Sequence, residues 1–202
     1  MRIAPGAVLL LLSSFALADT ASPSAALTTV TRLQDGLIAL MKSSDADPAR
    51  SEAVTKLLRE THDLSYIARV VLGRHWRELS PEQQAEFIER FEQLSVANYT
   101  SRFQHYGGER FDIAEEQTQS EDEHSVRSML TTAKGAQHEF VYVLHRDGEQ
   151  WRIVNIVVDG VSDLALKRAE YGRLMDAGGF QAVLDELAQQ TERLRARAAE
   201  AP

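Results

Sequence analysis

The sequence predicts an α+β fold in which a four-stranded antiparallel sheet packs with several helices. Two observations carry this prediction. Residues 111–158 form short runs with the side-chain pattern of strands, and turn segments separate them as in a meander. Apolar residues on both sides of this stretch recur at helical spacing. Helices grouped before and after a run of strands are typical of a single α+β domain.

Residues 1–18 are predicted to be a secretory signal peptide. Arg2 supplies a basic start, an apolar segment follows, and an Ala-Leu-Ala sequence ending at Ala18 has the small residues of a cleavage site. The apolar core is shorter than the roughly 20 residues that span a bilayer, so an uncleaved anchor is the weaker alternative. We therefore expect a periplasmic protein with a flexible lead-in at 19–26 and one domain at 27–198.

The composition excludes several function classes. The net charge is −8, and a nucleic-acid binder normally needs a basic face, so we expect no nucleic-acid partner. The chain has no cysteine, which excludes disulfides, cysteine nucleophiles and thiolate metal sites. Apolar residues make up 44% and charged residues 26%, as in an ordinary globular domain.

Four helices are predicted before the sheet and two after it. They cover 27–42, 51–60, 64–73, a long helix from Pro81 to a stop at Gly107-Gly108, 162–175 and 180–198. Asp63 is expected to cap the third helix. Ser80-Pro81-Glu82-Gln83 is a capping box with proline at the first helical position of the long helix. Gly178-Gly179 separates the last two helices.

Four strands are predicted at 111–116, 125–132, 138–145 and 151–158. The dipeptide Asp147-Gly148 is a strong hairpin signal between the last two. Both of these strands are apolar on two faces. Regular alternation divides the last strand into two apolar sets, one with Trp151, Ile153 and Val157, the other with Val154, Ile156 and Val158. Either helices cover both faces, or one face borders a cavity partly filled by an apolar ligand such as lipid tails.

No catalytic or metal-binding pattern stands out. The sequence has no nucleophile elbow, dinucleotide fingerprint or phosphate loop. His138 and His145 are seven residues apart, so one regular strand directs them to opposite faces. The other histidines lack ligand-like spacing and are expected at the surface or in caps: His62, His75, His105 and His124. Asn155 either contacts a ligand or satisfies a neighbouring backbone group, and we favour the second.

Two blocks resemble the MlaC, or toluene-tolerance, family of periplasmic phospholipid-binding proteins. The first, at 64–108, has an apolar segment ending in Leu-Gly, a Trp, the Ser-Pro-Glu-Gln box, a Phe-rich helix and a closing Tyr-x-Gly. The second is WRIVNIVVDGVS at 151–162, followed by Gly-Gly-Phe at 178–180. The similarity spans residues 27–195.

The resemblance implies a monomeric carrier with no enzyme activity, no metal and no cofactor. Family members hold acyl chains in an apolar cavity and shuttle phospholipids between an outer-membrane lipoprotein complex and an inner-membrane ABC transporter, which maintains outer-membrane lipid asymmetry. Two departures look more like the hopanoid-associated HpnM branch. Asn155 stands where the family has Asp, and DLALKRAEY (163–171) replaces the usual continuation with its later Asn-Tyr-Arg. The implied ligand is therefore phospholipid or hopanoid.

The predicted lipid-binding residues come from the long helix, from the last two strands and from the segment before the long helix. They are Phe87, Phe91, Leu94 and Phe103; Tyr142, Leu144, Trp151, Ile153 and Ile156; and Leu72 and Trp76.

Two other function classes stay open. A curved sheet facing a long helix also forms the cone of nuclear-transport-factor-like and cystatin-like folds. Enzymes of that shape use a buried acid or histidine with a shifted pKa on an apolar small molecule. An interaction module would instead bind a membrane complex through the polar C-terminal helix and would have a collapsed core.

Overall fold

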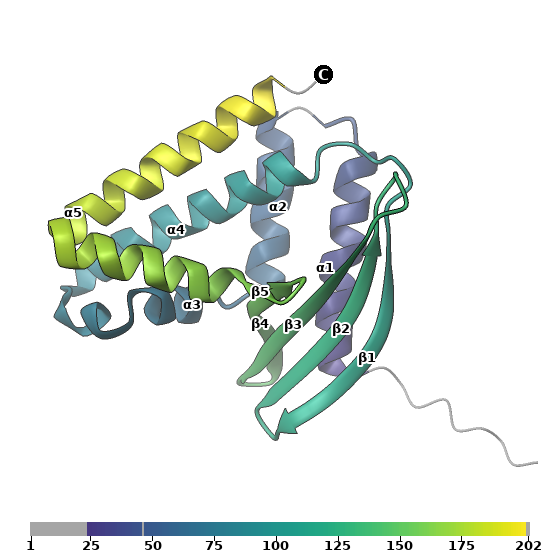
Figure 1. The fold of residues 1–202 in the computed structure, drawn as a ribbon, viewed down its shortest axis with the longest axis horizontal. Helices are drawn as coiled ribbons and strands as arrows, with labels where there is room; N and C mark the ends of the chain where they lie inside the picture. The colour runs from purple at the N-terminus through teal and green to yellow at the C-terminus, as the bar shows by residue number, and fades with distance from the viewer. Residues whose placement is uncertain (1–23, 46, 201–202) are drawn as a thin grey trace, which may run out of the picture.

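The computed structural model describes residues 24–45 and 47–200, so the predicted signal peptide and most of the predicted lead-in lie outside the described residues. The described chain folds into one antiparallel meander with helices on its sides, which confirms the α+β prediction (Figure 1). The sheet has five strands rather than four, in the order β1-β2-β3-β4-β5. The fifth forms because the turn at Asp159-Gly160 brings Val161 and Ser162 back against the end of the fourth.

The helices before the sheet are α1 (Ala25–Lys42), α2 (Asp47–Thr61), α3 (Leu64–Leu72), the 3-10 helix η1 (Gly73–Glu78) and α4 (Pro81–Arg102). The strands are β1 (Arg110–Ser120), β2 (Glu123–Thr131), β3 (Gln137–Asp147), β4 (Gln150–Val158) and β5 (Val161–Ser162), and α5 (Asp163–Ala199) follows them. Every predicted helix and strand is present, with ends shifted by a few residues. Among the described residues, no helix combines the length and apolar character needed to cross a membrane.

Side-chain caps begin four of these helices. Ser24, Asp63 and Ser162 each accept a hydrogen bond from a backbone N–H in the first turn of α1, α3 and α5. Ser80 and Gln83 form the complete capping box at the start of α4. The caps predicted at Asp63 and Ser80 are confirmed. These bonds satisfy donors that the first turn of a helix leaves free, and they set where each helix begins.

The long helix α4 ends earlier than predicted, at Arg102 instead of the glycine pair Gly107-Gly108. The guanidinium of Arg50, on α2, donates hydrogen bonds to the carbonyl oxygens of Phe103 and Gln104, the second at 2.8 Å. Those carbonyls are thereby satisfied from outside the helix. The early end of α4 therefore coincides with a contact from Arg50, which is distant in the sequence. Phe103 lies just beyond the helix.

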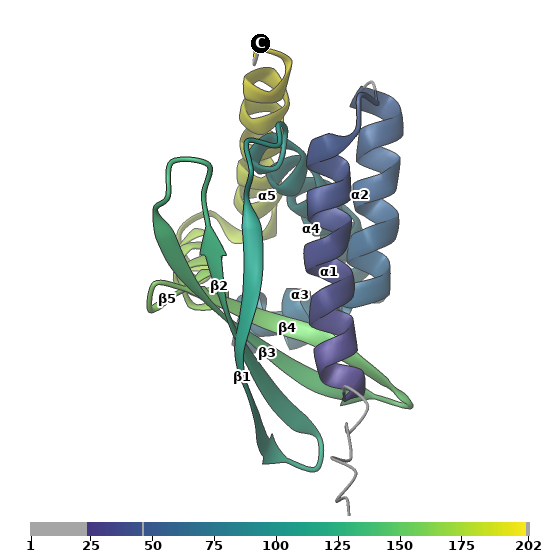
Figure 2. The ribbon, with the colours of Figure 1, turned by 90° about the vertical axis from the view of Figure 1, so that its right-hand side faces the viewer.

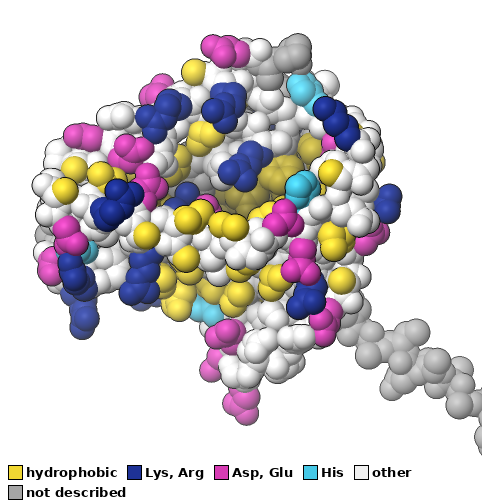
Figure 3. Space-filling model, in the orientation of Figure 1, with side chains coloured by type: hydrophobic (Ala, Val, Ile, Leu, Met, Phe, Trp, Pro, Cys, Tyr) yellow, Lys and Arg dark blue, Asp and Glu magenta, His cyan; other side chains and the backbone are white. Residues whose placement is uncertain are grey.

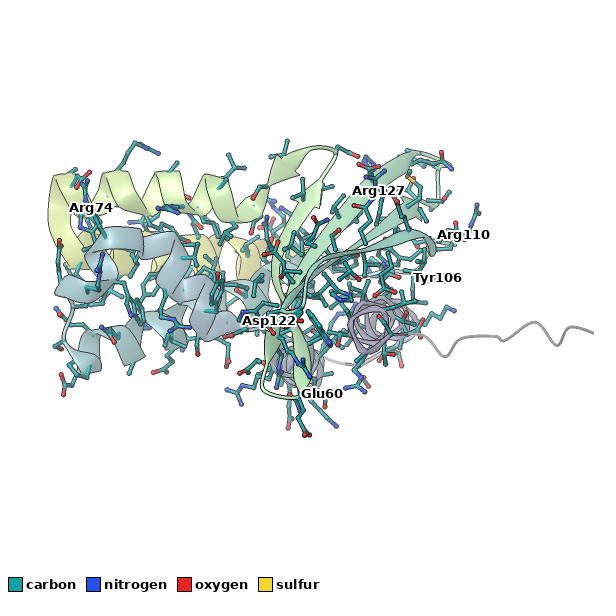
Figure 4. The ribbon with its side chains drawn as sticks, turned by 90° about the horizontal axis from the view of Figure 1, so that it is seen from below. Glu60, Arg74, Tyr106, Arg110, Asp122 and Arg127 are labelled. Atoms are coloured by element: carbon teal, nitrogen blue, oxygen red, sulfur yellow. The ribbon has the colours of Figure 1, made fainter. Side chains whose placement is uncertain are left out.

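A closed core lies between α1 and the sheet. Figure 2 shows α1 and α2 side by side along the sheet. Six core side chains there are at most 2% exposed: Val30, Leu33, Leu37, Val126, Tyr142 and Leu144. The amide of Gln34, also on α1, donates to Ser128 Oγ at 2.8 Å and to the Tyr142 hydroxyl at 3.3 Å. On the opposite face of the sheet Val141 and Val143 are half-buried, and Arg127 points away from α1 (Figure 4).

A β-bulge in β4 overturns the predicted division of its side chains between two faces. Tyr142 is paired with Ile156 and Leu144 with Ile153, so two steps along β3 match three along β4. The extra residue, Val154, shifts the alternation by one. Ile153 and Ile156 therefore share a face with Tyr142 and Leu144, whereas regular alternation had separated the two isoleucines.

The last helix, α5, consists of two arms that meet at Gly179, whose φ of 70° and ψ of −165° are not helical. We call residues 163–178 the first arm and residues 180–199 the second arm. Figure 1 shows the second arm turning back along the first, beside α4. The two helices predicted on either side of Gly178-Gly179 are thus present as these arms. Only glycine adopts this backbone conformation readily, which explains why the reversal occurs here.

Candidate functional site

A cavity of about 330 Å³ lies among α2, α3, α4, both arms of α5 and β4. Figure 3 shows a hollow between the arms of α5, with hydrophobic side chains at its floor and Lys and Arg side chains around it. Its apolar lining is formed by Leu58, Leu64, Ile67, Phe91, Leu94, Ile153, Val154, Ile156, Leu164 and Leu194. The volume is at the lower end of the roughly 300–1,000 Å³ typical of ligand pockets.

Helical periodicity sets which side chains reach the cavity. Along α4 the lining residues Phe91, Leu94 and Arg102 fall on one face with Asn98 and Tyr99 between them. The second arm of α5 presents one face in the same way, with Gln190, Arg193, Leu194 and Arg197. On both helices the face that lines the cavity carries apolar residues and, near the helix C-terminus, an arginine. The cavity therefore combines an apolar floor with charged side chains at its edge.

His62 is buried at the floor of the cavity, which corrects the prediction that it lies at the surface or in a cap. Its Nδ1 is 2.9 Å from the Thr61 hydroxyl, and its Nε2 is 3.2 Å from the Tyr99 hydroxyl. Burial lowers the pKa of His62 to about 3. Burial also raises the pKa of Tyr99 well above its ordinary value. Both side chains are therefore uncharged at neutral pH.

A buried histidine with a shifted pKa is the feature that the enzyme hypothesis requires, so its geometry matters. Both ring nitrogens of His62 already have hydroxyl partners. A general base works best with a pKa near the working pH, and a pKa of about 3 makes His62 a weak base. The arrangement is that of a neutral hydrogen-bonded network in the cavity wall. It gives the enzyme hypothesis little support.

The corner between α2 and α3 is tied to β4 directly beneath the cavity. The backbone N–H of Asp63 donates to the carbonyl oxygen of Ile153 at 3.1 Å, and His62 forms a parallel bridge with Ile153. The Asp63 carboxylate that caps α3 also lies 2.9 Å from Nε2 of His145 on β3. These contacts fix the helices that form the floor to the strands that form the wall.

Asn155 lines the cavity and supports the start of α5. Its Oδ1 accepts a hydrogen bond from the Ser162 hydroxyl at 3.0 Å, and that hydroxyl in turn caps α5. The sequence favours a backbone group as the hydrogen-bond partner of Asn155, and this prediction is wrong because the partner is the Ser162 side chain. The contact links the β4 wall to the first arm of α5.

Four of the eleven predicted lipid-binding residues line the cavity: Phe91, Leu94, Ile153 and Ile156. Six others lie in the surrounding core or at its edge: Leu72, Trp76, Phe87, Phe103, Tyr142 and Leu144. Trp151 lines a different groove, and its ring lies 4.3 Å from that of His124. Phe87 illustrates the difference, because aromatic rings of Trp76, Phe91 and Tyr171 surround it. Contact of any of these residues with lipid stays a prediction.

Sequence reasoning missed the walls supplied by α2, α3 and α5. Leu58, Ile67, Leu164 and Leu194 line the cavity but belong to helices in which apolar residues predict ordinary packing. A signal existed in the second arm of α5, where Gln190, Arg193, Leu194 and Arg197 follow the three-and-four spacing of one helical face. Nothing in the local residue pattern places that face opposite α4.

The chain is similar to known proteins in sequence and in fold. The model of the MlaC protein family matches residues 31–189. The toluene tolerance protein ttg2D of Pseudomonas putida is 24% identical over 153 residues, which cover 75% of this chain and 71% of that protein. A solved structure of a phospholipid-binding protein from Ralstonia solanacearum, in complex with a phospholipid, has a TM-score of 0.71 at 17% identity, covering 84% of this chain and 98% of that one. The structural likeness shows a shared fold.

Proposed function

Because this chain belongs to the MlaC family, we propose that it is a lipid carrier that holds phospholipid acyl chains in the cavity between α4, α5 and β4. The observation that carries the proposal is the apolar lining of this cavity. Ile67, Ile156, Leu164 and Leu194 in its wall are only half-buried, so acyl chains would remove further apolar surface from water.

The energetics of lipid transfer explain why such a cavity is useful. Each methylene moved out of water contributes about 0.8 kcal/mol, so two ordinary acyl chains hold a lipid in its bilayer by on the order of 20 kcal/mol. An unassisted lipid therefore crosses an aqueous compartment extremely slowly. A carrier that surrounds the chains with side chains such as Phe91 and Leu94 offsets most of that cost.

The carrier acts in the periplasm, to which the predicted signal peptide at 1–18 would direct it. It exchanges lipid with an outer-membrane lipoprotein complex and an inner-membrane ABC transporter, and it thereby maintains the lipid asymmetry of the outer membrane. Hopanoid is the alternative ligand, because Asn155 and residues 163–171 depart from the usual family pattern.

The test is gentle mass spectrometry of the mature protein purified from the periplasm, with extraction and identification of its lipid. We expect a two-chain phospholipid in stoichiometric amount. A hopanoid in its place would change the ligand. Folded protein without stoichiometric lipid would contradict the carrier proposal.

A matched pair of variants locates the lipid. Leu164→Trp places a large ring in the cavity wall, and we expect it to reduce the lipid retained per folded protein. Leu166→Trp, two residues further on, alters a side chain that is 59% exposed, and we expect it to retain lipid normally. Equal retention by both variants would exclude this cavity as the site of the acyl chains.

A further inference from the structure

The mouth of the cavity carries an excess of positive charge in an otherwise acidic protein. Arg102, Lys167, Arg193 and Arg197 line it, against the single carboxylate of Asp163. The whole chain has a net charge of −8. We call these four cations the cationic rim. They come from α4 and from both arms of α5, so the fold brings them together.

The other large grooves of the described structure show no such excess. The groove between α1, α2 and the β3–β4 hairpin is lined by four cations and three carboxylates. The groove between α2, α4 and the end of α5 has one cation, Arg195, and one carboxylate, Glu92. Charge is nearly balanced in both. The imbalance is therefore a property of the cavity that we assign to lipid, and not of clefts in this protein generally.

Two members of the rim have free guanidinium groups. Lys167 lies 3.5 Å from Asp163, and Arg193 lies 2.9 Å from Glu186. Within residues 24–45 and 47–200, no carboxylate lies within the 4.0 Å ion-pair distance of Arg102 or Arg197. The Lys167 side chain is 19% exposed, so this cation stands against the apolar wall and not in open water.

We propose that the cationic rim binds the phosphate of the lipid head group and makes the carrier prefer anionic phospholipids to zwitterionic ones. This inference rests on the proposed function. Guanidinium groups bind phosphate through paired N–H donors, and Lys binds it as a point charge. A cleft lined by one sign of charge over low-dielectric walls concentrates the field. A zwitterionic head group brings its own cation into that field, which cancels part of the attraction.

The test uses lipids that differ only in the head group. Delipidated protein is incubated with vesicles of equimolar phosphatidylglycerol and phosphatidylethanolamine with identical acyl chains. The protein is then separated, and its lipid is quantified by mass spectrometry. We expect phosphatidylglycerol to be enriched about fivefold to tenfold, which corresponds to a net gain of about 1 to 1.4 kcal/mol from partly exposed charge contacts. The enrichment should shrink as salt rises from about 50 mM to about 500 mM.

The double variant Arg102→Gln/Arg197→Gln should bring the ratio of the two lipids close to one. The matched control Arg77→Gln/Arg195→Gln removes two exposed charges outside the cavity and should keep the wild-type ratio. Equal uptake of both lipids by the wild type, or an enrichment that survives in the rim variant, would overturn the head-group inference and leave the carrier function intact. Failure of every protein to retain either lipid would overturn both.

A second arm separates a lipid head group from free phosphate. Inorganic phosphate is titrated into delipidated protein, and binding is followed by calorimetry and by its ability to displace bound phosphatidylglycerol. We expect weak binding and no displacement, because the apolar chains supply most of the affinity. Tight binding of inorganic phosphate that is lost in Arg102→Gln/Arg197→Gln would make the rim a site for free phosphate and overturn the inference.

Discussion

The closed core beneath α1 and the cavity beside α5 are built from the same kinds of residue, yet in one they pack against each other and in the other they line a cavity. In the closed core, α1 lies flat on the sheet, and Leu33 and Leu144 are at most 1% exposed. In the cavity the walls come mainly from α4, both arms of α5 and β4, and side chains such as Leu164 and Leu194 stay half-buried. The difference lies in how the elements are arranged and not in their apolar content.

This comparison shows why an apolar pattern alone does not identify a binding cavity. Leu, Ile, Val and Phe are the common residues on both sides of a buried contact between a helix and a sheet. The same residues line a cavity where α4, the two arms of α5 and β4 do not pack directly against one another. We expect substitutions in the two regions to differ in their effect on the free energy of unfolding, as the regions differ in packing.

The largest expected effect is in the closed core. Leu144→Ala should lower the free energy of unfolding by about 2–5 kcal/mol, because it leaves a void among fully buried neighbours. Ile156→Ala, in the cavity wall on the same face of the sheet, should cost less than about 2 kcal/mol, because Ile156 is already partly exposed. Urea unfolding of both variants without lipid measures the difference. Equal losses would mean that the cavity wall packs like the core.

The pH dependence of stability tests how dry the cavity floor is. The pKa of His62 is about 3 in the folded protein and about 6.5 when unfolded, so the unfolded chain binds the proton more readily. The free energy of unfolding should be insensitive to this group above pH 6.5 and should fall by about 1.4 kcal/mol per pH unit as pH decreases between these values. Over about two units the loss reaches roughly 3 kcal/mol.

The measurement is urea unfolding of the wild type and His62→Gln between about pH 6.5 and about pH 4. The variant should lose this part of the slope, and His105→Gln, which removes an exposed histidine, should keep it. An unchanged slope in His62→Gln would indicate that water reaches the floor of the cavity.

The backbone reversal at Gly179 should be sensitive to substitution. Gly179→Ala should lower the free energy of unfolding by about 1–3 kcal/mol, because an L side chain is strained at this φ and ψ. Gly172→Ala is the control, since its added Cβ would have no neighbour within 4 Å and its backbone is helical. It should stabilise the protein by about 0.5–1 kcal/mol. If thermal or urea unfolding showed that both substitutions change the free energy of unfolding in the same direction, the special role of Gly179 would be contradicted.

The smallest effect is expected at the cavity wall. Asn155→Asp retains an acceptor for the Ser162 hydroxyl, so the free energy of unfolding should change by less than about 0.5 kcal/mol. The added negative charge lies on the cavity lining and should weaken the preference for anionic lipid. The equimolar lipid competition measures that change. A rise in phosphatidylglycerol uptake would be inconsistent with the head-group inference.

Most of the elements could be predicted because their signals are local. The capping box at Ser80, the cap at Asp63 and the hairpin glycine Gly148 each act within a few residues. The bulge at Val154 could not be predicted, because regular alternation was the only rule available and β3 determines the register. The end of α4 depends on Arg50, which is distant in the sequence.

The candidate site was predicted only in part for a related reason. Phe91 and Leu94 were found because they recur at helical spacing on the apolar face of α4. The cationic rim was missed because exposed arginines on a polar helix are typical of any solvated face. These arginines come together only because the chain reverses at Gly179, which places Arg197 near the end of α4. Tertiary arrangement, and not residue type, makes them part of a site.

The position of the second arm of α5 has a consequence for how the protein matures. Phe91 on α4 and Ile153 on β4 are synthesised before the second arm, which carries Leu194 and docks only after the chain reverses at Gly179. A chain whose synthesis is not yet complete therefore exposes these apolar side chains to solvent. Docking of the second arm therefore completes the fold and supplies the last wall of the cavity in one step.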